Sequence, residues 1–115
     1  MKRIVGIHSL LLVAAVACTR DLSRLPPYTA YVGKTLPLTR SVGLYEQPKK
    51  VFVEKYVLQE HEQYASGRKI ATLQPGTAVE IVRVVFLEGI DARYIFAIGQ
   101  VRNPETGKSV TFEYN

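Results

Sequence analysis

The chain has 115 residues and a formal net charge of +5 at pH 7. That length allows one domain, and a single cysteine excludes an internal disulfide. Basic residues are scattered, which excludes the dense basic face typical of a nucleic-acid-binding protein, so we expect no nucleic-acid partner.

The first predicted element is a signal peptide over residues 1–17. Lys2 and Arg3 precede an apolar run from Ile4 to Ala17. This run is shorter than the roughly 20 residues that a membrane-spanning helix needs. A short positive segment followed by such a run is typical of a secretory signal. Removing the segment lowers the formal charge from +5 to +3.

The stretch Ala15-Val16-Ala17-Cys18 resembles the lipobox of bacterial lipoproteins. The resemblance implies cleavage before Cys18 and lipid attachment to that residue, in a diacylated or a triacylated form that the sequence does not distinguish. Ala15 departs from the family pattern, which more often has leucine there. The same residues also fit the A-x-A site of an ordinary secretory signal, which would leave a free thiol at the mature N-terminus.

The residue after the cysteine bears on sorting. In lipoproteins of enteric-type bacteria an aspartate there favours retention in the inner membrane, whereas this chain has Thr19, with Asp21 two positions further on. The resemblance therefore implies a protein of the bacterial cell envelope, held by lipid in the outer membrane and facing the periplasm. Acyl chains stabilise such an anchor by about 0.8 kcal/mol per buried CH₂.

Residues 18–27 are expected to form the lipidated N-terminus and a tether, because Pro26-Pro27 favours extended polyproline geometry. The packed domain is predicted over residues 28–115. Alternating apolar residues from Leu36 to Leu44 predict a strand that either lies at a sheet edge or begins after Pro37, because proline cannot donate to a ladder. Residues 51–59 predict a second strand. Residues 60–69 are predicted to form a polar loop, with the alternative that residues 58–65 form one helical turn.

The second half of the chain alternates between strand patterns and turn residues. Pro75-Gly76 predicts a type II turn, and a polar segment at 103–108 predicts a hairpin. In the last strand we expect Val110, Phe112 and Tyr114 to face the core. Ser109, Thr111 and Glu113 alternate with them and are expected to face solvent. The strands are predicted at 70–73, 78–87, 93–102 and 109–114.

Five or six short strands separated by turns predict an all-β fold. The stretch Ile70 to Tyr114 resembles bacterial SH3-like domains, which share its Leu73-Gln74-Pro75-Gly76 turn, its long Val/Ile-rich strand and its closing hairpin. The resemblance implies a small, partly open SH3-like barrel. Functions in that family range from cell-wall binding to structural roles, so the fold is evidence about shape alone.

Two sets of residues are candidates for catalysis. His61 lies between Glu60 and Glu62, where it is either a general base or a solvated loop histidine. We favour the solvated histidine, because no nucleophile or second ligand is near in sequence. Glu88 and Asp91 flank Gly89 and are either paired carboxylates or, as we prefer, a charged turn. We therefore expect no enzyme activity, no cofactor and no metal.

Aromatic and basic side chains suggest binding instead. The loop Gln59 to Lys69 carries an aromatic ring and two cations. Tyrosines there are either partner contacts or caps on the core with their hydroxyls in water. The candidate contacts are Tyr45, Tyr56, Tyr64, Arg68 and Lys69. We hypothesise a non-enzymatic binding module for an envelope protein or a cell-wall polymer. The alternative is an enzyme or enzyme inhibitor acting on cell-wall polysaccharide, which a deep acidic cleft would favour.

Overall fold

The computed structural model describes residues 18–48, 54–89 and 92–115. Over these residues the chain forms eight strands and two single-turn 3-10 helices, which confirms the all-β class. The strands are β1 (Cys18–Asp21), β2 (Thr35–Pro37), β3 (Val42–Glu46), β4 (Tyr56–Gln59), β5 (Arg68–Leu73), β6 (Ala78–Glu88), β7 (Arg93–Arg102) and β8 (Ser109–Tyr114). The 3-10 helices are η1 (Tyr28–Ala30) and η2 (Glu62–Tyr64).

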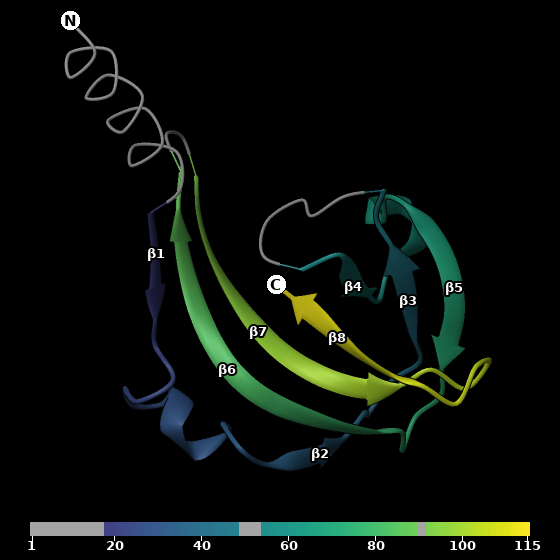
Figure 1. Ribbon diagram of the computed structural model, residues 1–115, viewed down its shortest axis with the longest axis horizontal. Coiled ribbons are helices and arrows are strands. Elements are labelled where there is room, and N and C mark those ends of the chain that lie inside the picture. The colour runs from purple at the N-terminus through teal and green to yellow at the C-terminus, as the bar shows by residue number, and fades with distance from the viewer. Residues whose placement is uncertain (1–17, 49–53, 90–91) are drawn as a thin grey trace, which may run out of the picture.

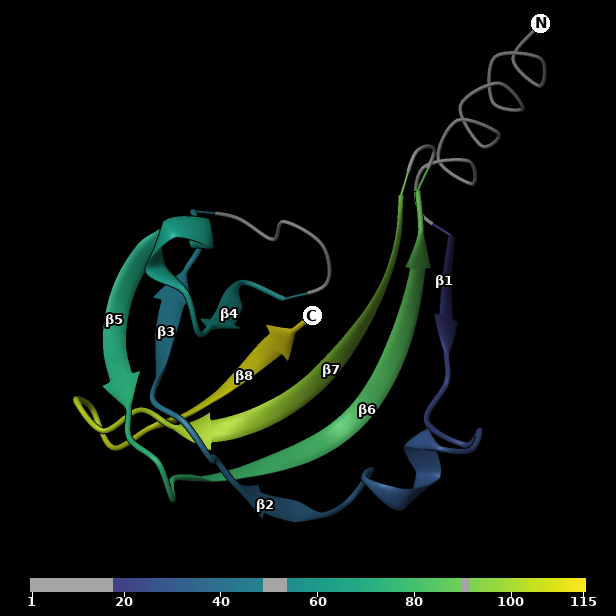
Figure 2. The same ribbon diagram turned by 180° about the vertical axis from the view of Figure 1, so that it is seen from behind.

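All eight strands belong to one sheet with the order β1-β6-β7-β8-β4-β3-β5, and β2 pairs with β6. Within the described residues this sheet does not close, so the domain is partly open, as predicted. Figure 1 shows β6 and β7 as two long curved strands, with β8, β4, β3 and β5 following one another on one side. Seen from behind, β1 and β2 lie along the outer edge of β6 (Figure 2).

An irregularity in β6 and a glycine in β7 lie next to each other, and the glycine adjoins β8. The pairing of β6 with β7 shifts register between Ile81 and Arg83, and such an irregularity bends a strand. Opposite it, a Cβ on Gly99 would lie 2.5 Å from the Glu80 carbonyl oxygen and 2.7 Å from Cζ of Phe112. The absence of a side chain at Gly99 therefore makes room for the Phe112 ring.

The main core lies where β3, β4, β5, β6, β7 and β8 meet. It buries apolar side chains from all of these strands, which gives a small domain its stability. The buried residues are Val42, Leu44, Leu58, Ala71, Leu73, Val79, Val101 and Phe112. The core therefore joins the two halves of the sheet, with β6, β7 and β8 in one half and β4, β3 and β5 in the other.

A second apolar cluster lies on the other face of β7. It contains Val85, Phe96 and Ile98, with Tyr94 stacked on Phe96 at a ring-centroid distance of 5.7 Å. Because side chains alternate along a strand, Ile98 points away from the face that Gly99 shares with Phe112. The sequence correctly placed Tyr94, Phe96 and Ile98 on one face.

The first part of the domain differs from the expected tether. Cys18–Asp21 pairs with the end of β6, and the Leu22 backbone N–H donates to the Val84 carbonyl oxygen at 2.8 Å. Leu22 is buried, and η1 follows Pro26-Pro27. Residues 18–22 therefore belong to the packed sheet, and this added strand is one reason why the structure has more strands than predicted.

The other strand predictions are met to different degrees. Alternation from Leu36 to Leu44 is split into β2 and β3, because the chain leaves the sheet between Pro37 and Val42. The second predicted strand is described only from Glu54 on, and forms β4. At the predicted type II turn, Gly76 has a φ of +91°, and the Thr77 N–H donates to the Gln74 carbonyl oxygen.

Candidate functional site

Buried Gln47 fixes the end of the polar loop that the sequence singled out. Its Nε2 donates to the Ser66 carbonyl oxygen at 2.6 Å, and its Oε1 accepts from the Ser66 hydroxyl at 3.1 Å. The next residue, Gly67, has a φ of +83°, and a Cβ there would lie 2.5 Å from the Glu46 carbonyl oxygen. Glycine is the residue that tolerates both conditions, so the loop has a fixed position beside β3.

Helix η2 presents an aromatic pair at the surface of this loop. Tyr64 is 73% exposed. The His61 ring meets it edge to face, with ring centroids 5.9 Å apart and an interplanar angle of 83°. The turn is closed by hydrogen bonds from Tyr64 N–H to the His61 carbonyl and from Ala65 N–H to the Glu62 carbonyl. The turn hydrogen bonds fix the backbone of the exposed Tyr64, and the contact with the His61 ring fixes its side chain.

A cavity of about 390 Å³ lies between this loop and the C-terminal end of β8. Its apolar wall comes from Val57, Leu58 and Phe96. Its polar wall combines amides, carboxylates and an imidazole: Gln47, Gln59, Glu60, His61, Glu113 and Asn115. Tyr64 and Tyr114 also line it. An apolar wall with a few polar groups is the usual make-up of a ligand site.

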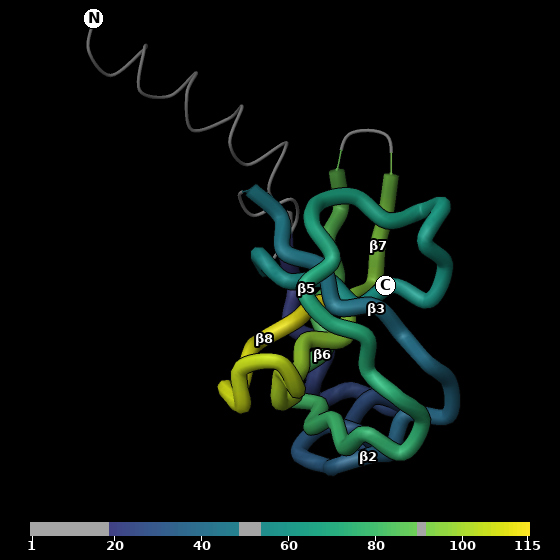
Figure 3. Tube along the Cα trace, turned by 90° about the vertical axis from the view of Figure 1, so that its right-hand side faces the viewer, coloured from purple at the N-terminus to yellow at the C-terminus, as the bar shows by residue number. Residues whose placement is uncertain are grey.

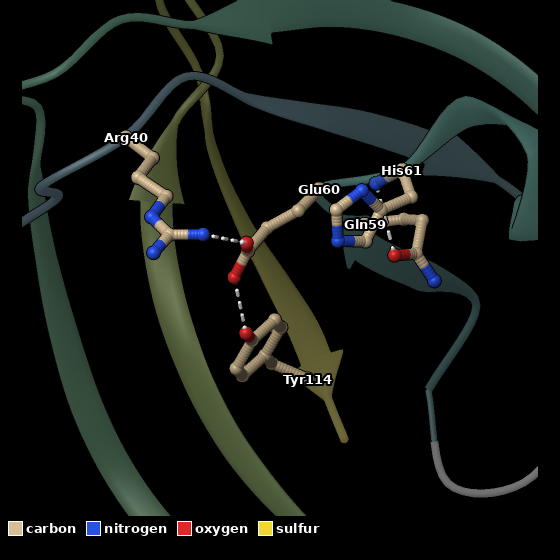
Figure 4. Close-up of polar contacts among 5 residues, drawn as sticks. All are labelled: Arg40, Gln59, Glu60, His61 and Tyr114. Carbon is tan, nitrogen blue, oxygen red and sulfur yellow. Dashed lines mark hydrogen bonds and ion pairs between the residues drawn. The ribbon is translucent and has the colours of Figure 1, made fainter.

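Glu60 joins three distant segments at the edge of this cavity (Figure 4). The Tyr114 hydroxyl donates to its Oε1 at 2.6 Å, and Arg40 Nη1 donates to its Oε2 at 3.3 Å. The hydrogen bond from Tyr114 lowers the pKa of Glu60, and Arg40 adds to this effect. The same bond raises the pKa of Tyr114. Glu60 is therefore ionised at neutral pH.

Glu113 is the buried carboxylate of the site, with 2% of its surface exposed. Its Oε1 accepts the Glu54 backbone N–H at 2.7 Å. The alternation of the last strand predicted that Glu113 faces solvent, and this prediction is wrong. The reason is that β8 lies between β7 and β4, and Glu113 is opposite Ile98 of the second apolar cluster. Tyr114, predicted to face the core, is instead exposed at the cavity.

The predicted contact residues are dispersed over the surface. Tyr64 lines the cavity, whereas Tyr56, Arg68 and Lys69 line a separate depression. Arg68 pairs with Glu46 at 2.5 Å and Lys69 with Glu62 at 2.9 Å.

Tyr45 offers almost no surface for a contact, since it is 5% exposed. A Cβ on Gly43 would lie 2.6 Å from Cε1 of Tyr45, so its ring packs over Gly43. Cys18, the proposed lipid site, opens β1 opposite Glu88.

Sequence reasoning missed the groups that organise the cavity, namely Gln47, Arg40, Glu113 and Tyr114. They come from segments far apart in the chain, and no short motif links them. The candidate carboxylate pair is only partly described: Glu88 forms an ion pair with Arg93 at 2.9 Å, and Asp91 lies outside the described residues.

A second depression, of about 460 Å³, shares Leu58, Glu60 and Tyr114 with the first. Its lining is mostly apolar and includes Leu36, Leu38, Val79, Ile81 and Phe112. Glu60 and Tyr114 therefore line both sites, and the contact between them separates the polar cavity from the apolar depression.

Within residues 18–48, 54–89 and 92–115, no group of three or more His, Cys, Asp or Glu residues is placed to hold a metal ion. The same part of the chain contains no helix long and apolar enough to cross a membrane. A scan against protein-family models, a search of curated proteins and a search of solved structures each found no match.

Proposed function

We propose that the protein is a lipid-anchored component of the bacterial cell envelope whose all-β domain binds a partner at the cavity beside Tyr64. The anchor is supported by the apolar segment and by Ala15-Val16-Ala17-Cys18, and Thr19 supports the outer membrane as its destination. One observation carries the binding role: the exposed Tyr64 ring, held by His61, stands beside a cavity with a hydrogen-bonded wall.

The arrangement suits recognition of a polar chain, either a protein segment or a cell-wall polymer. A preformed cavity loses little conformational entropy when a ligand binds, so little of the binding free energy is offset by ordering. A tyrosine ring gives a rigid apolar surface with a polar end, and such rings carry much of the energy at binding sites. Gln59, Glu60 and Asn115 supply donors and acceptors around it.

The surroundings of the two carboxylates favour binding over catalysis. A general acid that cleaves a glycosidic bond needs a carboxyl group with a raised pKa, whereas the pKa of Glu60 is lowered by Tyr114. Glu113 is buried and accepts the Glu54 backbone N–H. We therefore propose a module without enzymatic activity.

The test removes the aromatic pair and measures binding. Wild-type protein, the double variant His61→Ala/Tyr64→Ala and the control Tyr31→Ala are incubated with isolated cell-wall sacculi and, separately, with solubilised envelope proteins. Tyr31 is a suitable control because it is also exposed and is not part of the cavity lining. We expect the double variant to bind about tenfold more weakly, as for loss of a tyrosine hot spot, and Tyr31→Ala to bind as wild type does.

Equal binding by the double variant would refute the cavity as the contact site. Absence of any wild-type binding to sacculi and envelope proteins would refute the module itself. Release of soluble fragments from sacculi, stopped by His61→Ala, would establish the enzyme alternative.

A further inference from the structure

The position of Cys18 in the sheet determines which end of the domain would lie against a membrane. β1 begins at Cys18, which lies opposite Glu88 at the end of β6. The following Leu22 is buried against the sheet. No free spacer therefore separates Cys18 from the described domain, and a membrane-inserting group on Cys18 would hold this end of the sheet at the bilayer.

Strand register defines the surface that lies next to Cys18. Arg20, Phe86 and Ile95 lie side by side across β1, β6 and β7. Arg93 is two residues before Ile95, so it shares this face. Glu88 lies between Cys18 and Arg93 in the neighbouring row, so it is on this face too. We call Arg20, Phe86, Glu88, Arg93 and Ile95 the arm face. Figure 3 shows the end of β6 and the start of β7 side by side there.

The arm face combines apolar groups with one ion pair and one further cation. Ile95 is 41% exposed, Phe86 is half-buried, and Arg20 and Arg93 are exposed. Arg93 pairs with Glu88 at 2.9 Å, so its charge is balanced and Arg20 supplies the net positive charge of the arm face. Side chains of this kind suit the boundary of a bilayer, where apolar groups contact acyl chains and a guanidinium group such as that of Arg20 contacts lipid phosphates. The opposite face of the same strands carries Val85 and Phe96, which are buried within the protein.

The geometry places this face within reach of the anchor. Ile95 is two strands across and two residues along from Cys18, which corresponds to roughly 12 Å at ordinary strand spacings. We infer that the arm face lies on the surface of the lipid bilayer when Cys18 is anchored. This rests on the proposed anchoring of Cys18. Phe96, which lines the cavity, is on the other face of β7, so docking leaves the cavity open to a partner.

The chain contains no tryptophan, so a single introduced tryptophan reports its own surroundings. The probe is Ile95→Trp, and the matched control is Glu105→Trp in the exposed hairpin between β7 and β8. Arg20→Trp, in the same row as Ile95, serves as the probe if Ile95→Trp does not fold. The full chain is produced in bacteria, extracted from membranes and reconstituted into phosphatidylethanolamine and phosphatidylglycerol vesicles, with or without brominated acyl chains.

We expect brominated lipid to quench Ile95→Trp at least about twofold, because an interfacial side chain lies at the boundary with the acyl chains, and to leave Glu105→Trp unchanged. Equal quenching of both variants in protein that floats with the vesicles would overturn the inference. A blue shift of Ile95→Trp that disappears on dilution of protein at constant lipid would assign the face to a second copy of the chain, and would also overturn it.

Failure of the anchor itself is recognised separately, by the intact mass of the extracted protein. If Cys18 carries no acyl chain, a maleimide lipid is coupled to this single thiol and the same fluorescence comparison is made. Docking is then supported or refuted independently of natural lipidation.

Discussion

At the scale of single residues, Glu60 organises the edge of the candidate site. It receives hydrogen bonds from Tyr114 on β8 and Arg40 in the segment between β2 and β3. These contacts bring together residues up to 74 positions apart in the chain. The carboxylate thus links the opening of the cavity to both halves of the sheet.

The lowered pKa of Glu60 predicts a dependence of stability on acid. Because the folded state binds this proton more weakly than the unfolded state, the stabilisation is present above the ordinary glutamate pKa. It is lost as the pH falls through the lowered value. Between about pH 6 and about pH 3, wild-type protein should lose more stability than Glu60→Gln. Urea unfolding midpoints across this range measure the difference.

Glu105→Gln controls for the removal of one negative charge, because Glu105 is exposed on the far hairpin. Its acid profile should follow that of wild type. Parallel profiles for wild type and Glu60→Gln would show that folding does not lower the pKa of Glu60, and would contradict this prediction.

At the scale of elements, β8 connects the two halves of the domain. It pairs antiparallel with β7 on one side and parallel with β4 on the other. Phe112, at its centre, is opposite both Gly99 and Tyr56, and is buried in the main core. The core thus depends on the ring that crosses this junction.

Replacing Phe112 with alanine should therefore destabilise the whole domain. Truncation of a buried phenylalanine costs about 3–5 kcal/mol, a large part of the roughly 5–15 kcal/mol that stabilises a typical domain. Chemical denaturation followed by circular dichroism measures this loss. Ser109→Ala, on the exposed start of the same strand, should change stability by less than about 0.5 kcal/mol. A similar midpoint for Phe112→Ala and wild type would contradict this description of the core.

Local pattern predicted the later strands well and the first ones poorly. β7 and β8 have the predicted bounds, because turn residues separate two clear strand patterns. β1 was missed because its sequence, Cys-Thr-Arg-Asp, has little apolar character. It is held by pairing with β6, more than 60 residues away, and such pairing has no local signal.

At the scale of the whole molecule, the open sheet separates two surfaces. The arm face lies beside Cys18, while the cavity is formed by β4, the loop containing η2, and β8. A domain held at the bilayer by the first surface would present the second to a partner. Anchoring and binding are therefore compatible in one small fold.

The sequence indicated the loop of the candidate site but not its cavity. Tyr64 was found because it stands in a polar loop, where aromatic rings are exposed. The distinction between exposed Tyr64 and buried Tyr45 depends on packing, since Tyr45 covers Gly43 on β3. The contribution of Tyr114 and Glu113 depends on how the last strand is inserted between β7 and β4, which composition and periodicity do not specify.

The intact mass of the protein extracted from bacterial membranes tests the central claim most directly. We predict a chain that begins at Cys18 and carries two or three acyl chains, enough for stable anchoring, and a Cys18→Ser variant without them. An unmodified Cys18 at the N-terminus of the wild-type protein, or an uncleaved chain beginning at Met1, would contradict the account.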